Sequence, residues 1–304
     1  MTIAFVHAST AILPEIAAYR QYFTNLGYQT RECSLAELSK NPADIEWHFM
    51  GIHTRRTNPS ALLIHEYASR SAGRFGRLKD QLKKWINIRP DFRLFLNEYT
   101  RAGLNFTDQL PWGIRTTIYF PVDQPSGNPE KIYDFVYAGT TEASRQPEKW
   151  LSWFAPGGKL EGRSLLVLGP LRKQLVKKFP YQWIHFQDTV PPTAVDSYLQ
   201  QARFGLNFQP DTAPFNQQPS AKLLAYAAAK LPVISTDYAW VREFQRNYGG
   251  TYFFLNGEKA PTWEALTSFS YHFPDLSKWT LDYQLKNSGI LAFLEKYKRQ
   301  SASV

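Results

Sequence analysis

The stretch from Pro214 to Thr236 contains the residue whose type and position most clearly suggest chemistry. Lys222 falls in the first turn of a predicted helix, two residues after Ser220, whose hydroxyl can accept a hydrogen bond from an early backbone N–H. A cation at the start of a helix opposes the helix dipole, whereas the exposed N–H groups there attract anions. The pattern therefore predicts that Lys222 lies beside a bound anion.

Polar side chains near the ends of predicted strands in the first half form a second candidate site. His65 and Glu66 follow one apolar run, Asn97 and Glu98 follow the next, and His7 follows the first. Ligands of open parallel sheets bind beyond the carboxyl ends of the strands, so we expect these residues on one rim. Glu66 could act as a general base on a hydroxyl, with His65 beside it. The alternative is that His65 is a hydrogen-bonded structural histidine.

Two successions of strands and helices must position these residues. Apolar runs predict strands of the first half at residues 2–6, 28–33, 44–50, 61–65, 92–96 and 116–120. Similar runs predict strands of the second half at 133–138, 164–168, 183–186, 204–208, 233–236 and 251–254. Helical periodicity lies between most of them, and a segment rich in proline at 121–129 separates the halves. The sequence therefore predicts an α/β protein with two open parallel sheets.

The stretch PFNQQPSAKLLAYAAAKLPVIST resembles the nucleotide-sugar segment of GT-B glycosyltransferases, specifically the retaining family 4-like group (glycosyl transferases group 1). The matching positions are Pro219, Ser220, Lys222, Leu223, Tyr226, Ala228, Pro232, Val233, Ile234 and Thr236. The resemblance implies two Rossmann-like domains that face each other across a cleft. It implies an acceptor domain at 1–128, a donor domain at 129–285, and a terminal helix at 286–304 that packs back on the first domain.

The same resemblance implies a function and a set of site residues. The resemblance implies transfer of a hexose from a nucleotide-diphosphate sugar to a glycan or lipid-linked acceptor, with retention of configuration and without a metal or other cofactor. An Arg and a Lys clamp the donor diphosphate in the family, which points here to Arg145 and Lys222 as catalytic cations; Arg145 could instead be a solvated cation. The remaining donor contacts implied are Gly139, Thr140, Gly169, Gln187, Gln217, Ser220 and Leu223. A histidine near the reacting sugar in some members points to His65, with Glu66 beside it.

Three departures from the family pattern leave an alternative open. The two glutamates of the family fall here on Gln217 and Ala225, and the usual glycine before the strand is Lys230. The second glutamate normally holds the ribose hydroxyls, which an alanine does not. The alternative function is therefore a glycosyltransferase-like binding or adaptor subunit without catalysis.

A basic segment between two predicted strands of the first half suggests a further partner. Residues 70–93 contain eight Lys or Arg against two Asp, and Phe75, Leu78, Leu82, Trp85 and Ile86 recur at helical spacing. Such a helix can lie on an anionic membrane surface. The alternatives are a helix whose apolar face packs on the sheet, and a nucleic-acid binder, which the absence of a recognition module disfavours.

Composition narrows the remaining classes. The net charge of +9 favours anionic partners. A single cysteine, Cys33, forms no internal disulfide, and neither a signal peptide nor a membrane-spanning run is recognisable. We therefore expect a cytoplasmic protein, either free or peripheral at the inner membrane face. The histidines and the cysteine show no zinc-binding spacing, and no P-loop or serine elbow occurs, so no metal ligands are expected.

Overall fold

A computed structural model describes residues 1–7, 13–49, 51–71, 75–119, 129–257 and 259–301. The chain divides into two compact units. The first unit comprises Met1–Ile118 and Lys278–Val304, and the second comprises Tyr119–Ser277. Most of the segment predicted as a linker, 121–128, lies outside the described residues. Each unit contains one six-stranded parallel sheet, so the predicted α/β class is confirmed.

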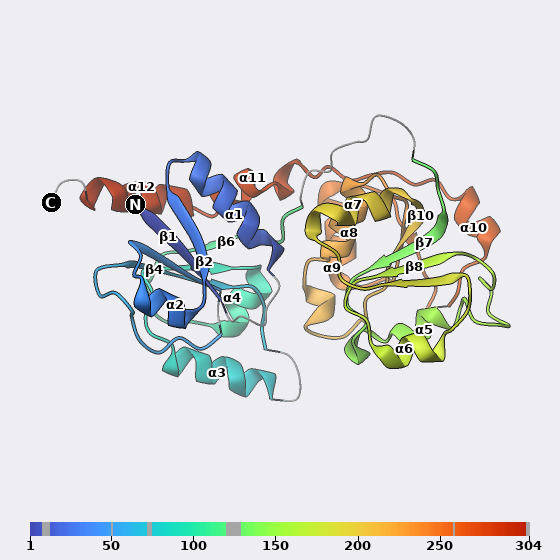
Figure 1. The fold of residues 1–304 in the computed structure, drawn as a ribbon, viewed down its shortest axis with the longest axis horizontal. Coiled ribbons are helices and arrows are strands. Elements are labelled where there is room, and N and C mark those ends of the chain that lie inside the picture. Colours follow the sequence, from blue (N-terminus) through green and yellow to red (C-terminus); the bar gives the residue numbers. More distant parts are fainter. Residues whose placement is uncertain (8–12, 50, 72–74, 120–128, 258, 302–304) are drawn as a thin grey trace. The chain divides into compact units, whose positions relative to one another are not determined.

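The sheet of the first unit has the strand order β2-β1-β3-β4-β5-β6 (Figure 1). Its strands are β1 (Thr2–Val6), β2 (Gln29–Cys33), β3 (Ile45–Phe49), β4 (Leu62–Tyr67), β5 (Phe92–Phe95) and β6 (Trp112–Ile114). The strand predicted at 116–120 is wrong over 116–119, and residue 120 lies outside the described residues. Pairing with β5 selects Trp112–Ile114 instead, and the Thr116 N–H donates to Gln284 Oε1 (3.0 Å). Gly113 permits this because a Cβ there would lie 2.0 Å from the Ser288 carbonyl oxygen.

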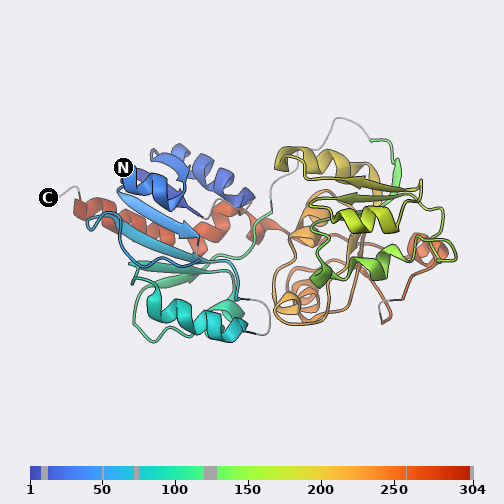
Figure 2. The same ribbon diagram turned by 60° about the horizontal axis from the view of Figure 1, so that its bottom comes forward.

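One face of this sheet is covered by α1 (Pro14–Asn25), α11 (Leu281–Asn287) and α12 (Ile290–Ser301). Figures 1 and 2 both show α1 and α12 on the side of the sheet away from α3. The core between them is aromatic, with Phe5, Tyr19, Phe23 and Trp47 fully buried and in ring contact. Burial of each such side chain contributes roughly 1.5–3 kcal/mol.

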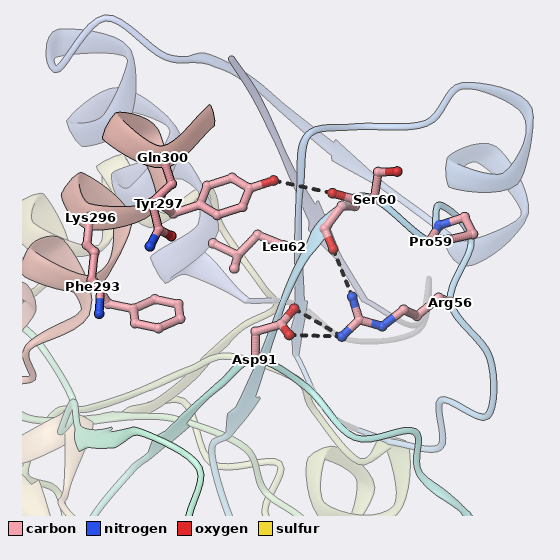
Figure 3. Close-up of a pocket in the computed structure, with 10 residues that line it drawn as sticks. Arg56, Pro59, Ser60, Leu62, Asp91, Phe293, Lys296, Tyr297 and Gln300 are labelled. Atoms are coloured by element: carbon pink, nitrogen blue, oxygen red, sulfur yellow. Dashed lines mark hydrogen bonds and ion pairs between the residues drawn. The ribbon is translucent and has the colours of Figure 1, made fainter. Parts of the chain in front are cut away.

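A cavity of about 370 Å³ lies where α12 meets the first unit's sheet. Figure 3 shows Tyr297 donating to the Ser60 carbonyl (3.3 Å) and Arg56 paired with Asp91 (3.0 Å). Leu62 begins β4, and Asp91 precedes β5, so the cavity lies at the amino ends of these strands. Ligands of parallel sheets bind at the opposite edge, so we interpret this cavity as part of the seat of α12.

The buried charges of this core are Glu66, on β4, and Arg115, just after β6. Both are almost inaccessible to solvent and form an ion pair. Glu66 also accepts from Trp47 Nε1 (2.8 Å) and from the Tyr19 hydroxyl (3.2 Å). Two charges are tolerated inside a core only when they are paired and hydrogen-bonded, as here.

The opposite face is covered by α2 (Leu35–Lys40), α3 (Gly76–Ile86) and α4 (Glu98–Leu104). The central strands present polar side chains to this face: Glu46, His48, His65 and Arg93, all buried. The apolar residues of this face cluster with Leu38 of α2 and with Leu104 of α4.

Helix α3 packs with its polar side inward. Asp80 is buried and accepts from Ser71 N (3.0 Å), whereas Phe75, Leu78, Leu82 and Trp85 are 63%, 68%, 51% and 84% exposed. The alternative in which the apolar face of this helix packs on the sheet is therefore wrong. We refer to these four residues as the α3 stripe.

The sheet of the second unit has the order β12-β11-β10-β7-β8-β9. Its strands are β7 (Tyr133–Ala138), β8 (Leu165–Leu168), β9 (Ile184–Gln187), β10 (Ala202–Asn207), β11 (Val233–Ser235) and β12 (Phe253–Phe254). Its helices are α5 (Pro147–Leu151), α6 (Lys173–Lys178), α7 (Pro192–Gln200), α8 (Ala221–Ala228), α9 (Ala239–Tyr248) and α10 (Trp263–Ser268), with short 3₁₀ turns at Ala143–Arg145 and Phe215–Gln217. Within the described part of the chain, no helix combines the length and apolar character needed to span a bilayer.

Replacement of Arg115 by Met should destabilise the first unit by about 3–5 kcal/mol, because the Glu66 carboxylate would stay buried without its counter-charge. Urea unfolding followed by circular dichroism measures this loss. Arg299→Met is the matched control, since Arg299 is 83% exposed in its pair with Glu295, and it should leave the unfolding midpoint almost unchanged. Equal midpoints for the two variants would contradict a structural role for the buried pair.

Candidate functional site

The strand order of the second unit reverses between β7 and β10, and the crevice at such a reversal is where open α/β sheets bind ligands. Gly139 follows β7, and Gly169 follows the neighbouring strand β8, with positive φ angles of 153° and 131°. The two turns touch, since a Cβ on Gly169 would lie 2.7 Å from the Gly139 carbonyl oxygen. A side chain at residue 169 is therefore excluded, and the rim beside β7 is built from bare backbone.

Helix α8 begins at this edge and is held by its cap. The Ser220 hydroxyl accepts from Leu223 N (3.3 Å) and donates to Asn207 Oδ1 (2.7 Å) at the end of β10. Asn207 in turn donates to Ser235 Oγ (2.9 Å) on β11. The start of α8 is thus tied to two strand ends, which positions Lys222 in its first turn.

Arg145 and Lys222 lie close together at this edge. The Arg145 guanidinium donates to Gln209 Oε1 (2.7 Å) and lies over the Phe215 ring at 4.2 Å. The Lys222 ammonium lies 5.1 Å from the centre of the Tyr137 ring, and its stem passes Gly139, where a Cβ would lie 3.4 Å from Lys222 Cδ.

The electrostatic state of Lys222 follows from this arrangement. Burial, together with the neighbouring charge of Arg145, lowers the pKa of Lys222 to about 7. Among the residues that the structure describes, no carboxylate forms an ion pair with either cation. Two adjacent, partly buried positive charges without a counter-charge are an unfavourable arrangement that a bound polyanion would relieve.

The other predicted donor residues of the second unit are distributed as follows. Thr140 lies beside the cations, and its carbonyl oxygen accepts from the Tyr137 hydroxyl (3.1 Å). Gln217 ends the turn after Phe215, and its N–H donates to the Pro214 carbonyl (3.1 Å). The Leu223 side chain is fully buried. Gln187 ends the edge strand β9, two strands from β7, and so lies apart from the others.

Tyr137 is a site residue that the sequence did not single out. Its ring stacks on Trp150 with centroids 4.4 Å apart and offers its face to Lys222. The available signal was an aromatic residue at the end of a strand that leads into a glycine. Aromatic residues are so frequent in this chain that the signal carried little weight.

His65 and Glu66, which we expected at the rim of the first unit's sheet, are buried inside it. Glu66 lies inside β4, with its carboxylate held by Arg115, so it is not available to an acceptor hydroxyl as a base. His65 is fully buried, contacts His53 Nδ1 (3.3 Å), and has a pKa held well below its usual range by burial. Its imidazole is therefore neutral and enclosed by protein.

The remaining rim residues also have structural partners. Asn97 caps α4, since its Oδ1 accepts from Thr100 N (2.9 Å). Glu98 is exposed and pairs with Arg101, which lowers the pKa of that carboxyl. His7 Nε2 lies 2.7 Å from Glu32 Oε1, and residues 8–12 lie outside the described part. These contacts do not bring His7, Asn97 and Glu98 into one site.

Comparisons with known proteins were made for the sequence and for the structure. No protein-family model matches the sequence, and no curated protein matches it. The structure is similar to Anabaena HepE in complex with UDP and glucose (TM-score 0.58, 8% identity, 100% of each chain covered). It is also similar to AviGT4, a glycosyltransferase of avilamycin A biosynthesis (TM-score 0.56, 14% identity, 98% of this chain and 96% of that chain).

A third similar structure is an α-glucosyltransferase in complex with UDP-glucose and DNA (TM-score 0.53, 11% identity, 78% of this chain and 80% of that chain). The chain therefore has the GT-B fold of these glycosyltransferases, as the sequence predicted.

Proposed function

We propose that this protein is a glycosyltransferase that takes a hexose from a nucleotide-diphosphate sugar and passes it to a lipid-linked or glycan acceptor. The observation that carries the proposal is the pair of cations, Arg145 and Lys222, at the strand reversal of the second unit, with no carboxylate paired to either among the described residues. The complexes of HepE with UDP and of the α-glucosyltransferase with UDP-glucose support a nucleotide donor in this fold.

The proposed chemistry uses these two side chains directly. When the sugar departs, negative charge grows on the diphosphate oxygen that it leaves. Arg145 would hold the diphosphate through its planar fork, and Lys222 would place a point charge on it. Both are pre-positioned, by Gln209 and Phe215 and by the cap of α8, so little reorganisation is needed. Retention of configuration is part of the proposal through the family resemblance.

The ribose must be held in another way than in the family, because Ala225 offers only a methyl group. This residue is the specific reason to keep a second candidate function, a binding subunit of the same fold without catalysis. The two functions differ in whether the second unit binds a nucleoside diphosphate.

The acceptor is proposed to lie at the surface of an anionic membrane. The α3 stripe presents two leucines and two aromatic residues to solvent, and the exposed cations Arg77 and Lys79 lie on the same helix. Apolar side chains beside Lys and Arg match the interface of an anionic lipid layer, such as the cytoplasmic leaflet. Contacts with DNA phosphates use cations alone, whereas a lipid layer uses both the cations and the exposed apolar side chains, so we favour lipid over DNA.

Nucleoside diphosphates should raise the melting temperature of the second unit. UDP, GDP, ADP, CDP and dTDP are the probes, and the correct one at a hundred times its Kd adds about 2.7 kcal/mol, or roughly 5 °C or more. Arg145→Met and Lys222→Met should each weaken binding about 10–100-fold, and Lys177→Met, an exposed cation on α6, should not. No shift with any of the five would leave only the non-catalytic candidate.

Lys222→Met should also stabilise the protein when no ligand is present. The pKa of Lys222 is lower in the folded protein than in the unfolded chain, so the unfolded chain binds more protons between about pH 7 and 10.5. The stability of the wild type should therefore rise with pH across this window, and Lys222→Met should flatten that rise. At pH 7 we expect a gain of about 1–3 kcal/mol, less than the full pKa shift implies because the side chain keeps some contact with water.

Thermal or urea unfolding at pH 7, 8, 9 and 10 measures this effect. The control Lys177→Met should keep the pH dependence of the wild type. Destabilisation by Lys222→Met at every pH would contradict a desolvated, uncompensated charge.

Replacement of Leu82 and Trp85 by Ser should reduce binding to vesicles with 30 mol% anionic phosphatidylglycerol by about tenfold or more, because the apolar contact with the lipid layer is removed. Sedimentation with these vesicles and with neutral phosphatidylcholine vesicles measures the change. Ile52→Ser is the control, since Ile52 is 60% exposed outside α3. Equal pelleting of the double variant and the control, or binding to DNA in preference to vesicles, would overturn the membrane proposal.

A further inference from the structure

A cluster of metal-binding side chains lies on the polar face of the first unit's sheet, away from the site described above. Glu46 and His48 are two residues apart on β3 and so project to the same face, and His53 comes from the loop that follows. Their exposed fractions are 1%, 4% and 3%. One ligand atom from each residue lies within 4.8 Å of the others. The fold has thus assembled a carboxylate and two imidazoles that no sequence spacing predicted.

The hydrogen bonds around His53 leave one of its nitrogens free. The Tyr67 hydroxyl lies 3.5 Å from His65 Nδ1, and His65 Nε2 lies 3.3 Å from His53 Nδ1. If His53 Nδ1 donates to His65 Nε2, His65 Nδ1 carries the other proton and donates to Tyr67. His53 Nε2 is then a bare lone pair. An outer hydrogen bond of this kind is what orients a metal-binding histidine.

The cluster contains two buried nitrogens without a partner. Within the described part of the chain, neither His48 Nε2 nor His53 Nε2 has a hydrogen-bond partner, although both side chains are more than nine-tenths buried. His48 Nε2 lies 3.5 Å from Glu46 Oε2, which is too long for a good hydrogen bond. The other carboxylate oxygen, Oε1, accepts from Asn58 N (3.2 Å), so Oε2 faces the imidazoles. Buried polar atoms are normally satisfied, so these two need an explanation.

We propose that Glu46, His48 and His53 bind one divalent transition-metal ion of the Zn²⁺ type. Two imidazole nitrogens and a carboxylate oxygen are a common ligand set for Zn²⁺, with bonds of about 2.0–2.2 Å. Two donors on a tetrahedral ion at such bond lengths are about 3.4 Å apart. The 3.5 Å separation between Glu46 Oε2 and His48 Nε2 is close to this value. The rings of His48 and His53 are stacked, with centroids 3.8 Å apart and an angle of 18° between their planes, so one ring must turn for both nitrogens to point at the ion.

The ion has a structural role in this proposal. His53 is held from both sides, because its N–H donates to Asn87 Oδ1 (2.8 Å) and its carbonyl accepts from Ile88 N (2.8 Å). The loop after β3 therefore brings His53 to the cluster before any ion binds. The three ligands are enclosed by protein, so the ion fastens the loop to β3 and does not meet a substrate.

Cobalt and zinc are the probes that test the site. The chelator-treated full-length protein should bind one equivalent of Co²⁺ and show the visible absorption of a four-coordinate ion, and Zn²⁺ should displace it. Zn²⁺ should also raise the melting temperature, because the unfolded chain lacks the assembled cluster. His48→Gln and His53→Gln should each lower the affinity for Co²⁺ at least tenfold. The control, His185→Gln, removes an exposed histidine on β9 and should keep the wild-type affinity.

A measurement on the wild type keeps the test valid if a variant fails to fold. In ¹⁵N-labelled protein, one equivalent of Zn²⁺ should shift the Nε2 resonances of two of the six histidines and leave those of the others close to their original positions. Absence of stoichiometric binding overturns the proposal. Binding that His185→Gln removes, or that His48→Gln and His53→Gln leave unchanged, also overturns it, because the ion would then be held elsewhere.

Discussion

The candidate site of the second unit depends on one electrostatic feature, positive charge that no neighbouring carboxylate among the described residues balances. Lys222 and Arg145 stand near each other without a carboxylate among their described neighbours, and burial moves the pKa of Lys222 toward neutrality. Such an arrangement costs folding free energy and persists only where the surrounding structure imposes it. The cap of α8 on Asn207 and the stack of Arg145 on Phe215 impose it here. The glycine turns after β7 and β8 present backbone, without side chains, beside these cations.

The strand–helix alternation was enough to predict the fold, because hydrophobic periodicity reports which residues are buried. Eleven of the twelve predicted strands overlap observed strands, and the exception is instructive. The run at 116–120 has better local β propensity than Trp112–Ile114, but pairing with β5 and the close approach of Ser288 to Gly113 decide the position of β6. These are contacts between residues far apart in the sequence, which a local pattern does not contain.

The candidate site was predictable only where a motif carried it. Ser220 and Lys222 were recognisable because a cap, a helix start and a cation occur in a fixed order. Glu66 shows the limit of this reasoning. It was placed on a rim because the apolar run ends before it, yet β4 continues through Tyr67 and buries the carboxylate against Arg115. From sequence alone, a charged residue inside a strand is easily mistaken for the end of that strand, because its distant partner is not known. The same limit hid the cluster of Glu46, His48 and His53, whose members meet only after β3 turns into its loop.

Helix α3 turns its polar side toward the protein, so its apolar residues are not the residues that stabilise the fold. In a typical amphipathic helix, the apolar residues form the core, so a substitution among them is opposed by loss of stability. In α3, Asp80 and Lys83 make the inward contacts, with Ser71. Leu78, Leu82 and Trp85 remain exposed to water. Selection for folding therefore exerts little pressure on these positions. Related proteins can exchange the chemical character of this surface freely, and lineages that work at different surfaces can diverge there while the sheet beneath stays the same.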